Sequence, residues 1–363
     1  MTFKARITFK KEKMTENKPT ENRSTENKPT EIKPAKKETI LSGMQPTGSL
    51  HIGNLEGALR NWVKLQNDYW MYLCIVDLHA LTAEYKNTTG MKDNIFYMAI
   101  DFLASGIDPK KCAIFIQSEV KEHAELHLIF SMLITVPTLT RLPTYQEKKS
   151  TLDSYGFLGY PVLQAADICL YNADKVPVGK DQEKHIWLAA DLAKRFNKIY
   201  KKTFVEPEAL FTEFPLIRGS DNRKMSKSLD NHISLELTAK QTEKKLMSFY
   251  TDEKKLRQGD PGRPEQCPIF LLHRLYTPQA ETEISPDCKS GKLGCVDCKM
   301  KLSKNLNNSL APIREKRLEL LQKPDYIWDV LKTGAEAASR RAENVMDKVK
   351  TAMKTNYRKK KKK

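Results

Sequence analysis

The stretch TILSGMQPTGSLHIGN, residues 39–54, is the most informative part of the chain for its fold. Its first five residues form an apolar run of strand length, and a turn containing Pro and Gly follows. The next segment predicts a helix, because Leu55, Leu59, Trp62 and Gln66 recur on one helical face. A buried strand, a turn and a helix in this order make up the first half of a βαβ unit.

The same alternation continues further along the chain. YWMYLCIV (residues 69–76) and CAIFIQS (residues 112–118) predict two more strands, and helices are predicted over residues 93–105 and 123–134. Strands that alternate with helices favour a parallel sheet, whose ligands bind beyond the carboxyl ends of the strands. The predicted fold class is therefore α/β with a Rossmann-like parallel sheet.

Composition divides the chain into four parts. Residues 39–235 carry the α/β pattern, whereas residues 236–355 lose the strand signal and predict a smaller all-helical C-terminal domain. Residues 1–38 contain TENKPTENRSTENKPTEIKP, which has no aromatic residue, so a disordered low-complexity extension is expected. Residues 356–363 end in RKKKKK and predict a disordered basic tail.

Charge and apolar content restrict the class of protein. The formal net charge of +17 suits a polyanionic partner such as nucleic acid, although a solubilising charge excess explains it equally well. The sequence has no apolar run long enough to span a membrane and no secretory signal, so a cytoplasmic protein is expected. Cys74, Cys112 and Cys169 lie in apolar runs and predict core residues.

Two short motifs predict a nucleotide site. His51-Ile-Gly-Asn54 lies between the first strand and the first helix, where unpaired backbone N–H groups attract phosphate. Lys224-Met-Ser-Lys-Ser228 follows a Gly-Ser-Asp-Asn turn, and its two lysines can close over a triphosphate. Each motif has a plainer interpretation: an ordinary strand–helix turn for the first and a solvated basic loop for the second.

Together and in this order, the two motifs resemble the paired signatures of class I aminoacyl-tRNA synthetases. SGMQPTGSLHIGNLEGALRNWVKLQ, CIVDLHALT, QSEVKEHAEL, YPVLQAADICLYNADKVPVGKDQEKH and GAEAASRRAENVM further resemble bacterial tryptophanyl-tRNA synthetases, over roughly residues 39–355. The resemblance implies an enzyme that activates L-tryptophan with ATP, releases pyrophosphate, and transfers tryptophan to tRNA(Trp).

The resemblance also implies residue roles around ATP and its Mg²⁺. Lys224, Lys227, Asn54 and His51 are the expected catalytic residues. The expected ATP-binding residues are Gln45, Pro46, Thr47, Gly53, Asn54, Gly179, Lys180, Asp181, Ile217, Lys224, Met225, Ser226, Lys227 and Ser228. Two positions depart from the family pattern: an acidic residue is common where Lys180 stands, and some members have Thr in place of His51.

A second set of residues predicts the amino-acid site. Tyr160, Gln164 and Asp167 have the spacing of one helical face, after Gly159-Tyr160-Pro161, which fits either a buried polar network or a ligand pocket. The resemblance implies that Asp167 accepts the indole N–H, with Tyr160, Gln164 and Gln182 near the ammonium group. Related tyrosyl-tRNA synthetases use similar residues for a phenol, so they remain an alternative, as does a non-catalytic RNA-binding paralogue.

Four cysteines cluster toward the C-terminus, with the spacing C-x₂₀-C-x₆-C-x₂-C: Cys267, Cys288, Cys295 and Cys298. Four thiolates suit Zn²⁺ or a [4Fe–4S] cluster, and the alternative is four unrelated free thiols. The pattern resembles a subset of tryptophanyl-tRNA synthetases that carries a [4Fe–4S] cluster beside the anticodon-reading region, which implies a structural or tRNA-positioning cluster here.

RNA binding is expected in the C-terminal helical domain, as an anticodon-binding domain. Its candidate phosphate contacts are Arg340, Arg341, Lys348 and Lys350, each of which also suits a solvated helix face. The basic tail is expected to strengthen RNA binding without sequence choice. The family resemblance further implies a homodimer.

Overall fold

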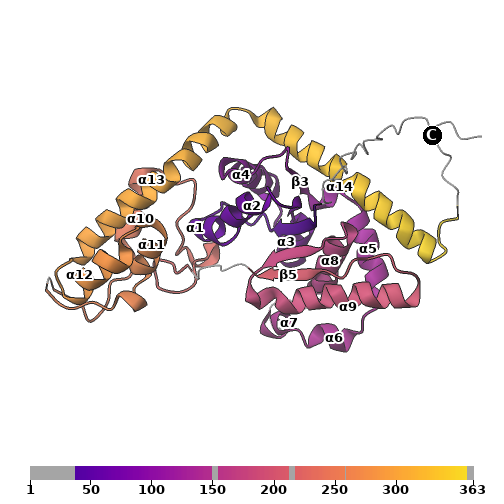
Figure 1. Cartoon of the computed structure of the whole chain (residues 1–363), viewed down its shortest axis with the longest axis horizontal. Coiled ribbons are helices and arrows are strands. Elements are labelled where there is room, and N and C mark those ends of the chain that lie inside the picture. The colour runs from indigo at the N-terminus through magenta and orange to yellow at the C-terminus, as the bar shows by residue number, and fades with distance from the viewer. Residues whose placement is uncertain (1–36, 149–153, 212–216, 258, 358–363) are drawn as a thin grey trace, which may run out of the picture. The chain divides into compact units, whose positions relative to one another are not determined.

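The computed structural model describes residues 37–148, 154–211, 217–257 and 259–357 (Figure 1). The expected disordered extension therefore lies almost wholly outside the described residues, and the expected tail lies largely outside them. Within the described part, no helix is both long enough and apolar enough to cross a membrane.

The sheet has five parallel strands in the order β3-β2-β1-β4-β5. Chain order reverses beside β1, since β2 lies on one side of it and β4 on the other, and such a reversal opens a crevice at the carboxyl ends of the strands. The strands are β1 (Thr39–Met44), β2 (Trp70–Ile75), β3 (Cys112–Ile116), β4 (Lys175–Val178) and β5 (Glu208–Phe211). The predicted α/β class with a Rossmann-like parallel sheet is confirmed.

Helices cover both faces of this sheet. Alternate residues of a strand point to opposite faces, so Met71 joins the core beneath α2 and α4, whereas Tyr72 joins the core beneath α5, α8 and α9. The helices up to β5 are α1 (Ile52–Asn54), α2 (Arg60–Leu65), α3 (Asp77–Glu84), α4 (Met91–Ala104), α5 (Glu122–Ser131), α6 (Val136–Thr140), α7 (Pro143–Lys148), α8 (Tyr155–Leu170) and α9 (Glu183–Ile199). A π-helical segment, Leu55–Leu59, joins α1 to α2 and buries its leucines as predicted.

The region after the sheet contains helices only, apart from loops, within the described residues. These helices are α10 (Ala239–Met247), α11 (Pro268–Tyr276), α12 (Ser285–Lys289), α13 (Cys295–Leu321) and α14 (Pro324–Ala352). The last of them differs from the sequence-based expectation, because it packs on the sheet as well as on the helices before it. α14 runs beside edge strand β3 (Figure 1), with Leu331 in the core of one sheet face and Val345 in the core of the other.

Two sequence-based details are also corrected. The helix that carries Asp167 does not follow Gly159-Tyr160-Pro161 but begins at Tyr155, where the Ser154 side chain accepts a hydrogen bond from the Phe157 amide and caps the helix. Pro161 lies inside it, held there by burial rather than by helix propensity. Strands β4 and β5 were not foreseen, because each has only four residues and β4 contains a proline.

Gly334 lets α14 approach β3 closely. A Cβ atom at this position would lie 1.8 Å from the backbone oxygen of Ile114. Exchanging Gly for Ala inside a helix normally stabilises a protein by about 1 kcal/mol, but the overlap here should outweigh that gain. We expect Gly334→Ala to lower the free energy of unfolding by about 1–3 kcal/mol in urea titrations.

The control for this prediction is Gly156→Ala in α8. A Cβ atom at Gly156 would have its nearest neighbour, Ser154 Oγ, at 3.8 Å, so the substitution should leave stability unchanged or raise it. Equal responses of the two glycines to alanine would show that α14 does not depend on this close approach.

Candidate active site

A cavity of about 640 Å³ opens at the carboxyl ends of β1 and β4. It lies where the order of the strands reverses, which is the expected ligand position in such a sheet. Residues predicted for both sites line it together: Gln45, Asn54, Gly179 and Lys224 from the nucleotide set, and Tyr160, Gln164, Asp167 and Gln182 from the amino-acid set.

The His51–Asn54 turn forms a capped helix start at the edge of this cavity. His51 Nδ1 accepts a hydrogen bond from the Gly53 amide (3.1 Å), and Asn54 Oδ1 accepts one from the His51 amide (3.0 Å). Burial, with further effects of His232 and Lys227, lowers the pKa of His51 to about 4, so the ring stays neutral and able to accept. A Cβ atom at Gly53 would lie 2.7 Å from the His51 ring, which gives the glycine a structural reason to be there.

The turn after β1 brings a backbone carbonyl toward the lysine loop, which we define as residues 217–231. The Thr47 amide donates to the Gln45 carbonyl (2.9 Å), and Gly48 has φ +107°, a conformation that favours glycine. Lys227 Nζ donates to the Gly48 carbonyl at 2.6 Å. Pro46 is buried and Thr47 exposed within the same turn.

The lysine loop folds back on itself beside this turn. The Met225 amide donates to the Ile217 carbonyl (2.9 Å), and both side chains are buried in the core. The hydroxyls of Ser226 and Ser228 lie 2.8 Å apart. Burial lowers the pKa of Lys227 to about 8, because the ammonium group is partly removed from water.

The segment after β4 supplies the last residues of the nucleotide set. Gly179 lines the cavity, Lys180 is exposed, and the side chain of Asp181 lies outside what the structure describes. Gln182 Oε1 lies 2.8 Å from His185 Nδ1, and the other nitrogen of that ring lies 3.4 Å from the Tyr160 hydroxyl.

Asp167 lies at the buried end of the cavity, with 3% of its surface exposed. His79 Nε2 lies 2.8 Å from one carboxylate oxygen and His123 Nδ1 lies 2.6 Å from the other, while Gln117 Nε2 donates to both at 2.8 Å. Burial alone would raise the pKa of this carboxyl, but the neighbouring His123 and His79 lower it below its usual range. Asp167 therefore presents an ionised, buried acceptor to the cavity.

These three partners of Asp167 were missed as site residues in the sequence. His79 follows the end of β2 by a few residues, and Gln117 follows β3 directly. Polar residues just beyond parallel strands are expected at the edge of the sheet where ligands bind, so both residues could have been predicted from their positions. His123 carried none, because it faces Asp167 only through the packing of α5 against α8; its second ring nitrogen lies 2.8 Å from the Tyr171 hydroxyl.

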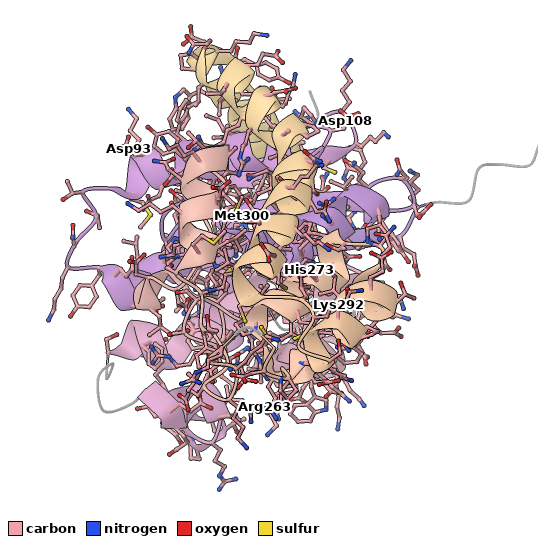
Figure 2. All side chains as sticks on the ribbon, turned by 90° about the vertical axis from the view of Figure 1, so that its left-hand side faces the viewer. Asp93, Asp108, Arg263, His273, Lys292 and Met300 are labelled. Carbon is pink, nitrogen blue, oxygen red and sulfur yellow. The ribbon has the colours of Figure 1, made fainter. Side chains whose placement is uncertain are left out.

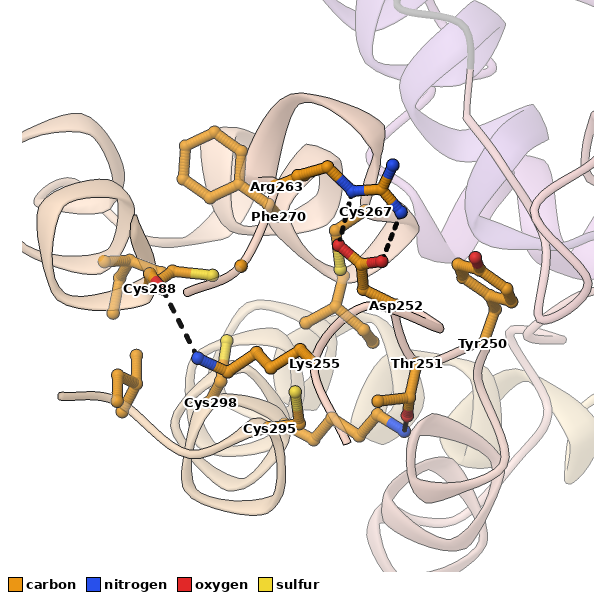
Figure 3. A pocket seen from close by; sticks show the side chains of 15 residues that line it. Tyr250, Thr251, Asp252, Lys255, Arg263, Cys267, Phe270, Cys288, Cys295 and Cys298 are labelled. Carbon is orange, nitrogen blue, oxygen red and sulfur yellow. Dashed lines mark hydrogen bonds and ion pairs between the residues drawn. The ribbon is translucent and has the colours of Figure 1, made fainter. Parts of the chain in front are cut away.

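The four clustered cysteines surround a separate, small cavity of about 30 Å³. Figure 3 shows the sulfur atoms of Cys267, Cys288, Cys295 and Cys298 turned toward one space. Figure 2 shows the same region with His273, Arg263 and Lys292 marked. Among the described residues, no three His, Cys, Asp or Glu side chains are placed to hold one metal ion.

Basic side chains line or adjoin the four-cysteine cavity. Lys255 Nζ donates to the Cys288 carbonyl (3.3 Å), and Lys299 Nζ donates to the Phe249 carbonyl (2.7 Å). Arg263 lies at the rim, paired with Asp252. A negatively charged group would therefore find compensating charge here.

Two of the four cations predicted to contact RNA on α14 have partners within the chain. Arg341 donates to the carbonyl of Tyr171 through Nε (3.0 Å) and Nη2 (2.9 Å), and Lys350 pairs with Glu125 (2.8 Å). Arg341 thus fastens α14 to the end of α8. Arg340 and Lys348 are exposed.

Comparison with known proteins agrees with this geometry. The family model for class I tRNA synthetases (W and Y) matches residues 33–311. The tryptophan–tRNA ligase of Thermotoga maritima is 46% identical over 322 residues, covering 86% of this chain and 98% of that protein. The ligase of Aquifex aeolicus is 40% identical, covering 86% of this chain and 99% of that protein.

A solved structure gives the same result in three dimensions. Tryptophanyl-tRNA synthetase from Campylobacter jejuni, complexed with ADP and tryptophan, matches with a TM-score of 0.79 and 35% identity, over 87% of this chain and 99% of that one. The predicted family is therefore confirmed by sequence and by fold: this chain belongs to the class I aminoacyl-tRNA synthetases, and among them to the bacterial tryptophanyl-tRNA synthetases.

Proposed function

We propose that the chain activates L-tryptophan with ATP, forming tryptophanyl-adenylate and pyrophosphate, and then esterifies tryptophan to tRNA(Trp). One observation carries the proposal: a single cavity has the ionised Asp167 at its buried end and Lys224 of the lysine loop in its wall. ADP and tryptophan bound in the Campylobacter jejuni relative support the same pair of ligands.

The reaction requires no protein nucleophile, because the tryptophan carboxylate attacks the α-phosphorus of ATP. The chain lowers the barrier by aligning the two reactants and by placing positive charge beside the departing phosphates. Lys224 and Lys227 supply that charge, and Mg²⁺ bound by the phosphates would share it. Asn54 and His51 hold the nucleotide at the helix start, where the hydrogen bonds from the His51 amide to Asn54 and from the Gly53 amide to the His51 ring keep the turn rigid.

The remaining nucleotide contacts follow the geometry of three loops. Gln45, Pro46 and Thr47 follow β1, Gly179, Lys180 and Asp181 follow β4, and the Ile217–Met225 pair backs the lysine loop against Gly53. We assign these segments, with Ser226 and Ser228, to ATP.

At the other end of the cavity, Asp167 accepts the indole N–H of tryptophan. An ionised carboxylate that is already held by three donors can only accept from a ligand, and it stays fixed while doing so. Tyr160, Gln164 and Gln182 line the path toward the sheet edge and face the ammonium group. A site built on such a hydrogen bond discriminates against amino acids that cannot donate there.

Pyrophosphate exchange across the twenty amino acids tests the function. Tryptophan is expected to support exchange of labelled pyrophosphate into ATP, with tyrosine inert. Exchange with tyrosine instead would assign the chain to the tyrosyl alternative, and no exchange with any amino acid would favour the non-catalytic RNA-binding paralogue.

For the four cysteines we propose a [4Fe–4S] cluster, with Zn²⁺ as the alternative. The donor set fits, since four thiols face one cavity whose wall carries Lys255, Lys299 and Arg263. A single Zn²⁺ draws four sulfurs to about 2.3 Å from one point, whereas a cluster binds each cysteine through a different iron. Among the described residues no three of these side chains are set for one ion, so the proposal rests on the donor set and on the basic side chains beside it.

Anaerobically purified protein is expected to be brown and to contain about four irons per chain. Cys295→Ala should lose most of the iron and the visible absorbance, whereas Cys169→Ala, which alters a buried core thiol, should keep both. Colourless protein with one zinc per chain would show that the four cysteines bind Zn²⁺ and not an iron–sulfur cluster.

RNA and a second subunit complete the proposed set of partners. Residues 236–355 would read the anticodon, with the exposed Arg340 and Lys348 as phosphate contacts and the basic tail adding affinity. A homodimer is carried over from the family resemblance, and the exposed apolar side chains of Leu128, Met132 and Val136, on and after α5, are the surface that we assign to it. A cytoplasmic site of action fits the supply of tRNA.

A further inference from the structure

We propose that Asn231 is a positioning residue for the lysine loop, and that it sets the directions in which Lys224 and Lys227 reach the triphosphate. The inference rests on the proposed function, since it concerns how the same site holds ATP. Asn231 closes the loop in sequence, and it has only 2% of its surface exposed. Such a buried amide must have its hydrogen bonds satisfied within the chain.

The amide of Asn231 clamps the backbone on both sides of Met225. Its Oδ1 accepts a hydrogen bond from the Ser226 amide (2.7 Å), and its Nδ2 donates to the carbonyl of Lys224 (3.1 Å). In a parallel sheet, a residue likewise bonds to the C=O and the N–H on either side of the residue beside it. The side chain of Asn231 therefore satisfies two backbone groups of the loop, as a neighbouring strand satisfies those of an extended segment.

The clamp fixes which side chains point inward. Met225 is buried, 3.9 Å from where a Cβ atom of Gly53 would lie, so the loop is seated on the helix start that holds the nucleotide. Lys224 then faces the cavity, and Lys227 reaches the carbonyl of Gly48. A rotation of the peptides beside Met225 would turn both lysines away.

Asn231 is itself held from two sides. Nδ2 also donates to Asp221 Oδ1 (2.7 Å), and that carboxylate is oriented by Arg223. The backbone oxygen of Asn231 accepts from the Ser220 amide (2.9 Å), and the Ser220 oxygen accepts from the Tyr250 amide (2.7 Å). At Gly219 a Cβ atom would lie 2.3 Å from Asn231 Cγ, so this glycine makes room for the clamp.

The test compares three variants in tryptophan-dependent pyrophosphate exchange. Asn231→Ala is expected to lower kcat/KM for ATP by about 10- to 100-fold, because two backbone groups of the loop lose their partner. The KM for tryptophan should change by less than about twofold, because its site lies on other elements. Asn231→Asp should be at least as impaired, since it sets a carboxylate against Asp221 and the Lys224 carbonyl.

Adding Asp221→Asn to Asn231→Asp supplies the rescue. It restores a donor–acceptor pair at this contact with the roles exchanged, and should raise kcat/KM for ATP by about 5-fold or more over Asn231→Asp alone. No recovery would show that the loss in Asn231→Asp does not arise at its contact with Asp221.

The matched control is Asn197→Ala. Asn197 also clamps a loop through its amide, accepting from the Thr203 amide (2.8 Å) and donating to the Phe204 carbonyl (2.9 Å), but it is not part of the cavity wall. It should lower stability and leave kcat/KM for ATP unchanged. Hydrogen exchange adds a readout independent of activity: the Ser226 amide should exchange faster in Asn231→Ala and not in Asn197→Ala.

The outcomes separate this inference from the proposed function. Unchanged kcat/KM for ATP in Asn231→Ala, equal losses for ATP and tryptophan, or an unaltered Ser226 amide would each overturn the positioning role. A parent protein that exchanges no pyrophosphate with tryptophan would overturn the proposed function instead, while the Ser226 measurement would still report on the clamp.

Discussion

Asp167→Asn should lower kcat/KM for tryptophan in pyrophosphate exchange by about 100-fold or more. The substitution keeps the size of the side chain but removes its negative charge and one of its two acceptor oxygens, which weakens the site for the indole N–H. It also leaves His79, His123 and Gln117 facing an amide that can accept through only one of its two polar atoms. Discrimination between tryptophan and tyrosine should fall with it.

The same variant should lose stability in a pH-dependent way. Because His123 and His79 hold the pKa of Asp167 below its usual range, the ionised carboxylate stabilises the folded chain above about pH 4, the ordinary carboxyl value. That stabilisation is lost as the pH falls through the lowered folded pKa. The melting temperatures of parent and variant should therefore differ at pH 7 and converge in acid.

Asp174→Asn is the control for this prediction. Asp174 accepts a hydrogen bond from the Thr39 amide at 2.7 Å, away from the cavity wall. It should change stability without changing kcat/KM for tryptophan. If Asp167→Asn kept the parent's amino-acid preference, the indole-binding role would be wrong.

Lys227→Met should lower kcat/KM for ATP by about 100-fold, the usual effect of removing one charge that stabilises a transition state. In the parent enzyme, kcat/KM for ATP should also decrease on the alkaline side of its pH profile, which we call the alkaline limb. Burial lowers the pKa of Lys227 to about 8, and only the ammonium form attracts phosphate, so kcat/KM for ATP should fall as the pH rises through about 8. Lys227→Met should lack that limb.

The lowered pKa of Lys227 can also be tested by measuring proton uptake when ATP binds. A lysine pKa lowered by burial means that the protonated form is disfavoured in the free enzyme, and a triphosphate beside it would restore the proton. ATP binding near pH 8 to 9 should therefore take up a proton, seen in calorimetry as a heat that depends on the buffer.

Lys245→Met serves as the matched control, because Lys245 Nζ likewise donates to a loop carbonyl, that of Asp230, at 2.7 Å but lies on α10, outside the Lys224–Ser228 motif. It should leave both kcat/KM for ATP and the alkaline limb in place. An alkaline limb that survives in Lys227→Met would have to belong to another group.

The sequence allowed strands β1 to β3 and the nucleotide edge of the sheet to be predicted, because these depend on local patterns. The runs that became β1, β2 and β3 are apolar and bounded by turns, and the residues of the His51–Asn54 turn lie next to one another in the chain. Lys224 and Asp167 were predicted through their motifs, and both line the cavity.

What could not be predicted depends on packing between distant segments. His123 meets Asp167 only because α5 packs on α8, and no spacing in the sequence encodes that contact. Asn231 lies three residues beyond the Lys224–Ser228 motif, and its burial arises from Gly219 and Ser220 folding back over it, which no local pattern encodes. The course of α14 was not predicted, because an Ala-rich helix indicates close packing without indicating which element it packs against.

The packing of α14 on β3 also determines when, during translation, the edge of the sheet becomes covered. β3 leaves the ribosome long before residues 324–352, and until they arrive its outer backbone groups have no cover from α14. An uncovered strand edge is a template for pairing with other chains. From the synthesis of β3 until that of α14, the nascent protein therefore exposes a strand edge that can associate with other chains, and α14 then covers it.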